Sequence, residues 1–365
     1  MIRLFNCRNN IKVSNEVKKI LLTNEIFVGE NVKKLEKKLC QFFSKKKYIV
    51  ATSDLANSVF LILKAKGIKK NDEILIPSFN CLSSTNSIKN IGAKPIWVDL
   101  EKNYPEMSLE MCQKLITKKT KALILYHIAG YPADTFKFKK FCKKNKILFI
   151  EDINSSLGAK QKNIKIGTHS DIAILSFYPN RHLSSINGAA IACKNKSFAN
   201  KLRSMRKFGI VEKRNKKFFD NKLLIKREGH FFEMPDINAA ILNSKIQKFN
   251  KKIYLTNKNV NFFDKNLVSN NLFKKILPDK QKFPNNWIYF IRSNKSKFLM
   301  KKLNEKKIET SKIHFPNHKY TNLFKTKKKL PNTEKFFKEV IGLPCGWWLK
   351  KKEITYIVKT LNNLS

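Results

Sequence analysis

Short apolar runs alternate with amphipathic stretches through the first two thirds of the chain, and this alternation constrains the fold most. The runs carry few charges, as strands buried on both faces do. Helical patterns lie between them, as crossovers between parallel strands require. The sequence therefore predicts an α/β fold with a mainly parallel sheet. The predicted strands are Glu73–Ile76, Pro95–Val98, Ala122–Leu125, Ile147–Ile150, Ile172–Leu175 and Ala190–Cys193, and the predicted helices are Ala56–Ala65, Cys81–Ile91, Leu109–Ile116 and Thr135–Lys144.

Polar side chains end or closely follow several of these apolar runs. They are Ser78, His127, Asp152 and Ser176. In open parallel sheets, ligands bind beyond the carboxyl ends of the strands. The pattern therefore predicts a pocket at that edge, although a single polar residue at such a place also serves as an ordinary turn residue.

The composition changes near Gln247, where Lys- and Asn-rich segments punctuated by prolines begin. A weaker apolar run at Trp287–Phe290 and a closing amphipathic pattern at Ile354–Leu361 indicate a strand and a helix. We therefore predict a large α/β domain over residues 1–246 and a smaller C-terminal α+β domain over residues 247–365.

The chain has 365 residues, is 42% hydrophobic and has a formal net charge of +48. The hydrophobic content is sufficient for a sizeable core. The charge favours anionic partners. It is spread along the whole chain, mostly as Lys beside abundant Asn, Ile and Phe, as an AT-rich coding bias would also produce, and no nucleic-acid-binding motif accompanies it. We expect no sequence-specific nucleic-acid binding.

Seven cysteines are scattered along the chain and never form a Cys-x-x-Cys pair. This spacing argues against a disulfide framework and against a metal site. The N-terminal residues lack the apolar region of a signal peptide, and no segment offers about 18 uninterrupted apolar residues. We therefore expect a soluble cytoplasmic protein with no membrane span.

Eight segments resemble, in order, the motifs of the DegT/StrS family of sugar-nucleotide aminotransferases. They include Gly92–Asp99, similar to the family's Gly-Ala-x-Pro-x-Phe-x-Asp, and His127–Asp134, similar to His-x-x-Gly-x-Pro-x-Asp. The others are Asn71–Phe79, Glu151–Ala159, Ser170–Phe177, Met234–Ala240, Trp287–Tyr289 and Leu343–Pro344.

This resemblance covers nearly the whole chain and implies fold type I, a pyridoxal-phosphate (PLP) cofactor and a homodimer in which both subunits build each site. It also implies a context of nucleotide-sugar and surface-polysaccharide precursor synthesis. Both the substrate and the retained chemistry depend on the site residues.

Arg181 stands where the family has the lysine that carries the cofactor as an imine. The segment is Ser176-Phe177-Tyr178-Pro179-Asn180-Arg181-His182, and the family pattern is Ser-Phe-x-x-x-Lys. An imine forms from a neutral amine, whereas a guanidinium stays protonated up to a pKa above about 12. The resemblance therefore implies a member of the family that holds no covalent PLP, and one that holds no cofactor at all is a further possibility.

Two predicted cofactor residues match the family pattern. Asp152 falls on the aspartate that pairs with the pyridine nitrogen, and Ser176 falls on a serine that contacts the phosphate. A helix N-cap after a strand would be the structural role of Asp152.

Other positions depart from the family. The Ser-Gly-Thr-Ala phosphate turn aligns with Asp54-Leu55-Ala56-Asn57, so Ala56 replaces the hydroxyl, although Ser58 could supply a substitute. Cys81 stands for the aromatic residue that stacks on the ring, and Ser155 for the glutamine near its phenolic oxygen. Phe231 stands for the asparagine that reaches the partner's phosphate.

Several functions follow from these departures. The first is a homologue that has lost imine chemistry but still binds a nucleotide-sugar-like anion or pairs with an intact aminotransferase. The second is an active enzyme with altered chemistry, because Pro179–His182 resembles the Pro-Ser-His-His segment of sugar 3-dehydratases, with His182 one place late. A transaminase that uses another lysine, and an unrelated anion-binding role, are the remaining alternatives.

Overall fold

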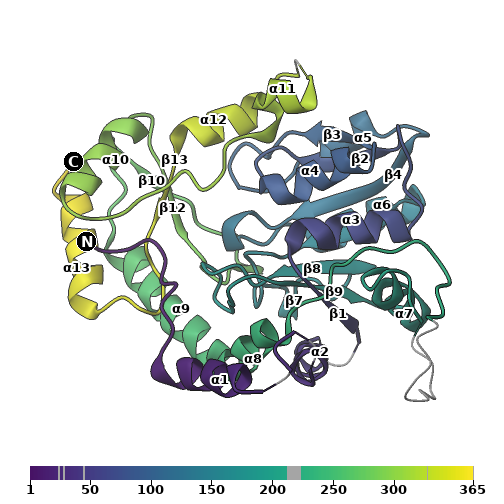
Figure 1. The fold of residues 1–365 in the computed structure, drawn as a ribbon. Coiled ribbons are helices and arrows are strands. Elements are labelled where there is room, and N and C mark those ends of the chain that lie inside the picture. The colour runs from purple at the N-terminus through teal and green to yellow at the C-terminus, as the bar shows by residue number, and fades with distance from the viewer. Residues whose placement is uncertain (24, 28, 44–45, 212–222, 327, 365) are drawn as a thin grey trace.

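A seven-stranded sheet forms the centre of the larger part of the molecule (Figure 1). The computed structural model describes residues 1–365 except 24, 28, 44–45, 212–222, 327 and 365. Among the described residues, the strands of this sheet lie in the order β1-β9-β8-β5-β4-β2-β3. The strands are β1 (Tyr48–Thr52), β2 (Glu73–Pro77), β3 (Lys94–Val98), β4 (Thr120–Tyr126), β5 (Leu148–Asp152), β8 (Ile172–Ser176) and β9 (Ala189–Cys193).

The direction of the strands confirms a mainly parallel sheet. β3, β2, β4, β5 and β8 pair in parallel, and only β9 runs antiparallel to its two neighbours, β8 and β1. β1 therefore points the same way as β8, so the carboxyl ends of the parallel strands and β1 meet at one edge. All six strands predicted in this part are present, and β1 was not predicted.

The apolar runs are buried on both faces because helices cover both sides of the sheet. Alternate residues of one strand, such as Leu75 and Ile76 in β2, belong to different hydrophobic clusters. Ile76 shares its cluster with residues of α3 and α7, and Leu75 shares its cluster with residues of α5 and α6. A layer of helices on each face thus explains the near-continuous hydrophobicity of the strands.

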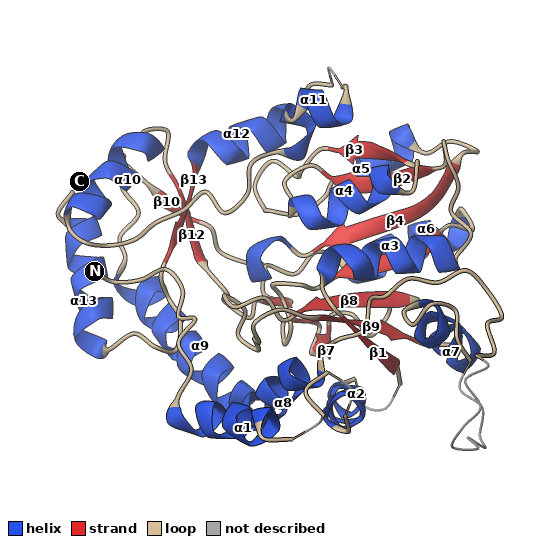
Figure 2. Cartoon of the chain, in the orientation of Figure 1, coloured by secondary structure: helices blue, strands red, loops and turns tan. Residues whose placement is uncertain are grey.

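Helices flank the sheet as the amphipathic stretches predict (Figure 2). The four predicted ones agree with the structure to within one residue at each end, and Thr135–Lys144 agrees at both ends. The helices of this part are α1 (Ile11–Leu21), α2 (Asn31–Phe42), α3 (Leu55–Ala65), α4 (Leu82–Asn90), α5 (Leu109–Leu115), α6 (Thr135–Lys144), α7 (Lys196–Met205) and α8 (Asp236–Lys245).

The C-terminal part has its own hydrophobic cluster around a small antiparallel sheet ordered β10-β12-β13. Ile2, at the start of the chain, pairs with Ile308 and joins this cluster. The predicted strand at Trp287–Phe290 lies two residues later, and the closing helix is longer than predicted. The elements are α9 (Phe249–Asn266), β10 (Lys274–Lys275), β12 (Tyr289–Arg292), α10 (Ser296–Glu305), α11 (Thr321–Phe324), α12 (Pro331–Glu339), β13 (Val340–Leu343) and α13 (Lys351–Asn362).

A third sheet, also small, joins the two parts. In it β11 (Lys282–Phe283) of the C-terminal part pairs with β6 (Lys160–Gln161) of the larger part, and β6 pairs with β7 (Ile164–Lys165). The boundary between residues 246 and 247 stays a prediction. It falls between α8 and α9, at the short 3-10 turn Ile246–Lys248.

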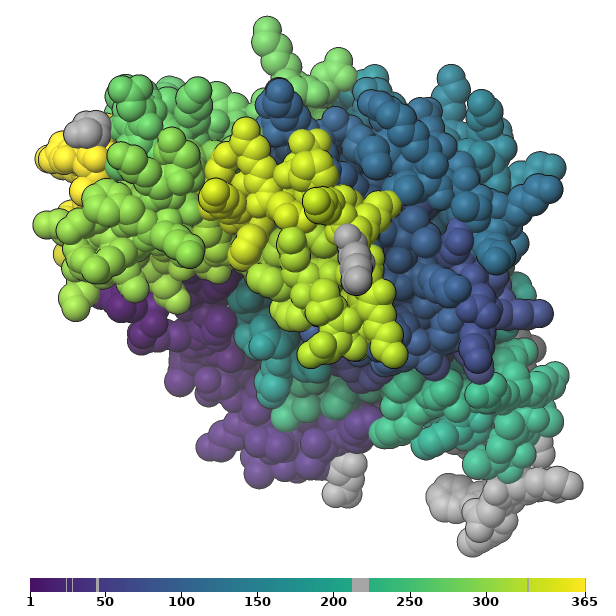
Figure 3. All heavy atoms as spheres, turned by 90° about the horizontal axis from the view of Figure 1, so that it is seen from above, coloured from purple at the N-terminus to yellow at the C-terminus, as the bar shows by residue number. Residues whose placement is uncertain are grey.

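Asp99, which follows β3, holds α12 against the large sheet. Its carboxylate accepts hydrogen bonds from the backbone N–H groups of Asn332 (3.0 Å) and Thr333 (2.7 Å) and from the Thr333 hydroxyl (2.7 Å). The carboxylate is buried and so supplies, from another element, the cap that the first turn of α12 requires. Figure 3 shows the yellow-green C-terminal segments lying against the blue segments of the large part.

We expect Asp99→Ala to lower the free energy of unfolding by about 2–4 kcal/mol, because it leaves buried N–H donors of α12 without an acceptor. Asp99→Asn keeps one acceptor oxygen and costs less. Denaturant titration followed by far-UV circular dichroism measures both, with the exposed Glu16→Ala as the control. A loss for Asp99→Ala no larger than that for Glu16→Ala would contradict this role.

Candidate functional site

A cavity of about 490 Å³ opens at the carboxyl-end edge of the large sheet. Its walls come from the segments after β1 and β2, from the segment after β8, and from the C-terminal part. It therefore lies where open parallel sheets bind ligands. Four predicted site residues line it together: Ala56, Cys81, Ser176 and Arg181.

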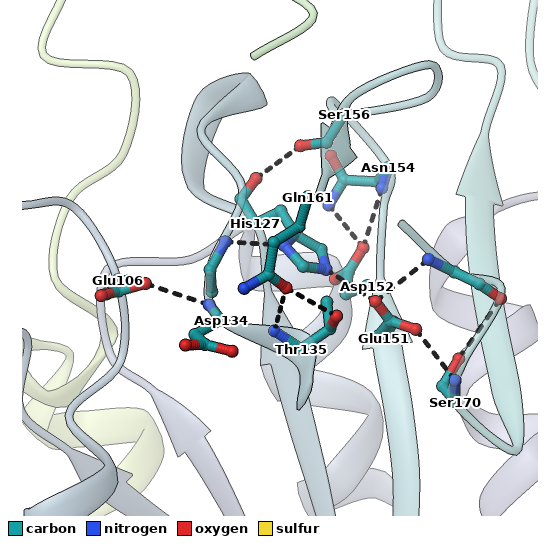
Figure 4. Close-up of polar contacts among 12 residues, drawn as sticks. Glu106, His127, Asp134, Thr135, Glu151, Asp152, Asn154, Ser156, Gln161 and Ser170 are labelled. Atoms are coloured by element: carbon teal, nitrogen blue, oxygen red, sulfur yellow. Dashed lines mark hydrogen bonds and ion pairs between the residues drawn. The ribbon is translucent and has the colours of Figure 1, made fainter. Parts of the chain in front are cut away.

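Asp152 lies at the end of β5, completely buried. One carboxylate oxygen accepts a hydrogen bond from the Ser84 hydroxyl (2.8 Å). The other accepts from the backbone N–H (3.1 Å) and the side-chain amide (2.8 Å) of Asn154 (Figure 4). Burial raises the pKa of Asp152, and these hydrogen bonds oppose that rise.

Asn154 connects this carboxylate to Arg181. Its amide nitrogen donates to Asp152, and its amide oxygen accepts from Nη2 of Arg181 at 2.8 Å. Asp152, Asn154 and Arg181 thus form one chain of hydrogen bonds in which a neutral amide lies between a carboxylate and a guanidinium. Asn154 was not among the predicted site residues.

The rest of the Arg181 guanidinium lies against Trp287. The centre of the guanidinium is 4.4 Å from the centre of the Trp287 ring, a cation–π contact. Within the described part of the chain, Nε and Nη1 of Arg181 are buried and have no hydrogen-bond partner. Burial lowers the pKa of Arg181, but a guanidinium keeps its charge at neutral pH.

A second set of polar side chains lies around Tyr126, the last residue of β4. Its hydroxyl lies 3.1 Å from Oγ of Ser155 and 3.0 Å from Nε2 of His314, which lines the cavity. Burial raises the pKa of Tyr126 to about 12 and lowers that of His314 to about 3, so both are neutral at pH 7. Ser155 is therefore behind the cavity wall, engaged with Tyr126.

The N-terminus of α3 forms another part of the cavity wall and is already capped. Asp54 is the N-cap residue, and its carboxylate accepts from the Asn57 backbone N–H (2.8 Å) and side-chain amide (2.7 Å) and from the Ser53 hydroxyl (3.1 Å). Ser58 is buried, with its hydroxyl 2.5 Å from Oγ1 of Thr52. A negative carboxylate thus occupies the positive end of this helix.

The remaining predicted residues lie in different surroundings. Ser176 lines the cavity, and its Oγ accepts from the backbone N–H of Tyr178 at 3.3 Å. His182 is buried outside the cavity lining, where burial lowers its pKa to about 3. Phe231 is half exposed and stacks between Phe27 and Phe208.

Ser78 and His127 also follow strands but do not line the cavity. The Ser78 hydroxyl lies 2.6 Å from Nδ1 of His318, and Nε2 of His127 lies 3.2 Å from Glu151 (Figure 4). Since Nδ1 of His127 accepts a hydrogen bond from the backbone N–H of Ala133, its Nε2 carries the proton toward Glu151. Both residues hold buried segments together.

Sequence reasoning missed Asn154, Tyr126 and His314 as site residues. Asn154 and Tyr126 had a detectable signal, because each lies at a predicted strand end beside a residue that was singled out. His314 lies in the C-terminal part, and only the folded chain brings it to Tyr126.

No helix in the described part of the chain is long and apolar enough to cross a membrane. Nor do the described residues contain a cluster of three His, Cys, Asp or Glu side chains that could hold a metal ion.

Comparison with known proteins places this cavity in a family context. The chain is 26% identical to GDP-perosamine synthase of Escherichia coli O157:H7, with 92% of this chain and 90% of that protein covered. The structure aligns with the sugar aminotransferase CalS13 of Micromonospora echinospora at a TM-score of 0.92, 21% identity and full coverage of both chains.

The structure also aligns with Streptococcus pneumoniae Spr1654, which has been solved in PLP and PMP forms. The TM-score with the PMP form is 0.93 at 19% identity, with 100% of this chain and 99% of that chain covered. These likenesses support fold type I. The profile of the DegT/DnrJ/EryC1/StrS aminotransferase family matches residues 9–362, and the chain therefore belongs to this family of sugar aminotransferases.

Proposed function

We propose that this chain is a sugar-aminotransferase homologue that has lost PLP-imine chemistry and binds a nucleotide-sugar-like anion in its cavity. The hydrogen-bonded chain from Asp152 through Asn154 to Arg181 carries the proposal. In the family, the residues at 152 and 181 hold opposite ends of the cofactor ring. Here one amide side chain connects them, which supports a site without the ring between them.

The chemistry of Arg181 supports the same conclusion. Imine formation needs a neutral amine, and the guanidinium offers none at neutral pH. Among the described residues, none of those that line the cavity is a lysine that could take its place. This weighs against a transaminase that uses another lysine.

The surroundings of α3 do not fit the cofactor phosphate. The Asp54 carboxylate already accepts from the helix N-terminus and would repel a dianion there. Ser58 is engaged with Thr52 and so does not replace the missing hydroxyl. Loss of the threonine and asparagine donors, at Ala56 and Phe231, would weaken phosphate binding by about 3–6 kcal/mol, a factor of about 10² to 10⁴.

His182 does not support a 3-dehydratase-like enzyme. Its ring is buried outside the cavity lining, and burial lowers its pKa to about 3, so it stays neutral at pH 7. In the described residues its Nδ1 has no partner. An acid–base group for the second chemistry would need contact with the cavity.

The likeness to GDP-perosamine synthase supports a nucleotide-sugar context for this proposal. In that context the anion would be a sugar derivative, and a cytoplasmic location would give access to it.

We expect the wild-type protein incubated with PLP and then reduced with borohydride to gain no stable pyridoxyl-phosphate mass on any lysine. Arg181→Lys alone should add little, because Asn154 and Asp54 still occupy the places that the ring and the phosphate need. Arg181→Lys combined with Asn154→Ala and Asp54→Ser should bind PLP at least about tenfold more tightly than Arg181→Lys. Visible absorbance of the imine and peptide mass analysis measure both effects.

A stable adduct on a lysine of the wild-type protein would overturn the proposed loss of imine chemistry. Equal and tight PLP binding by the single and the triple variant would show that Asn154 and Asp54 do not exclude the cofactor.

We also propose that the chain is a homodimer. Phe27, Phe208 and Phe231 stack on one another while remaining 36%, 52% and 51% exposed, and Leu223 and Ile225 nearby in the chain are 60% and 59% exposed. Exposed apolar groups of this extent are typical of interaction surfaces. In the family, the segment around Phe231 contacts the neighbouring subunit.

Sedimentation equilibrium should therefore show a dimer at micromolar concentration, and Phe231→Glu should weaken it about tenfold or more by burying a charge in the interface. Phe298→Glu is the matched control, because Phe298 is 50% exposed on α10. A wild-type protein that is only monomeric, or equal effects of the two substitutions, would contradict this surface.

A further inference from the structure

Arg181 has more hydrogen-bond donors than the protein satisfies. A guanidinium carries five N–H groups, and Asn154 takes one of them at Nη2. Nε and Nη1 are buried and, among the described residues, have no acceptor, while Trp287 covers one face of the group. A buried donor without an acceptor costs about 1–3 kcal/mol, and more when the group is charged. Such a cost points to a ligand oxygen.

The Arg181 side chain borders the cavity, although Nε and Nη1 themselves expose almost no surface to it. Arg181 lines it, and its volume of about 490 Å³ lies within the range of small-molecule sites, about 300–1,000 Å³. The flat side chains of Trp287 and Tyr178 form apolar walls, and Ser83 and Asn187 add polar groups that can bond hydroxyls.

The charges around the cavity select the kind of anion. Arg181 is the one cationic side chain among the described lining residues, and Asp54 is a carboxylate in the same wall. Asp152 lies one amide away from Arg181. His314 contributes no positive charge at pH 7, because burial lowers its pKa to about 3. This balance accommodates one negative charge better than the two of a phosphate monoester.

We infer that the cavity binds a carboxylate monoanion at the guanidinium of Arg181, which turns its unpartnered N–H groups toward the ligand on binding. A planar carboxylate matches the fork of a guanidinium. The inference deepens the proposed function and rests on it, since a cofactor ring would take the same space. The carboxylate can belong to a sugar acid or to a small 2-oxo acid, and the walls of Trp287 and Tyr178 can accommodate either.

Isothermal titration calorimetry of the full-length protein tests this with matched probes. Glucuronate and glucose differ by a carboxylate, glucose 1-phosphate offers a dianion, and pyruvate represents the small 2-oxo acids with a single carboxylate. We expect glucuronate or pyruvate to bind at least about tenfold more tightly than glucose and glucose 1-phosphate. The tighter of the two identifies the source of the carboxylate.

Arg181→Gln should weaken that binding by about 10- to 150-fold, the effect of losing a charged hydrogen-bond donor. Arg181→Lys keeps the positive charge but lacks the planar guanidinium that can donate two parallel hydrogen bonds. Its affinity should lie between those of the wild-type protein and Arg181→Gln. Arg8→Gln removes the same charge from an exposed position and should change nothing, even though the net charge of +48 attracts all anions. Circular dichroism verifies that each variant is folded.

Binding of glucuronate and pyruvate no tighter than that of glucose would overturn the inference, as would equal losses for Arg181→Gln and Arg8→Gln. These results would leave the proposed loss of imine chemistry intact. The borohydride adduct on the wild-type protein tests that loss separately.

Discussion

The hydrogen-bonded chain of a buried carboxylate, an amide and a partly buried guanidinium is the interaction on which the rest of this site depends. Removing Asp152 and Arg181 from water is costly unless each charge finds partners. Asn154 offers a donor to one and an acceptor to the other. A single neutral residue thus connects both charges, the Ser84 hydroxyl adds a second donor to Asp152, and two nitrogens of Arg181 stay without an acceptor among the described residues.

The same chain depends on the architecture around it. β5 delivers Asp152, the segment after β8 delivers Arg181, and the C-terminal part delivers Trp287 against the guanidinium. Trp287 in turn donates from its indole nitrogen to the backbone oxygen of Asn180 at 2.7 Å. The two parts of the molecule therefore close the cavity together, as the Asp99 contact with α12 holds them together farther away.

The sequence predicted the large sheet well because its strands are buried on both faces and stand out as apolar runs. β1 (Tyr48–Thr52) was not predicted, because it directly follows a lysine cluster. The strand predicted near Trp287 was shifted, since the buried apolar run begins at Trp287, two residues before β12 starts to pair. Family motifs located the cavity wall, but the partners of Arg181 could not be predicted, because tertiary packing alone determines which side chains satisfy a guanidinium.

The most direct test of this account is a crystal structure of the wild-type protein grown with excess PLP. We expect the Asn154 amide within hydrogen-bond distance of both Asp152 and Arg181, with no pyridine ring between them. Electron density for a cofactor ring paired with Asp152, and an Asn154 side chain displaced from Arg181, would contradict it.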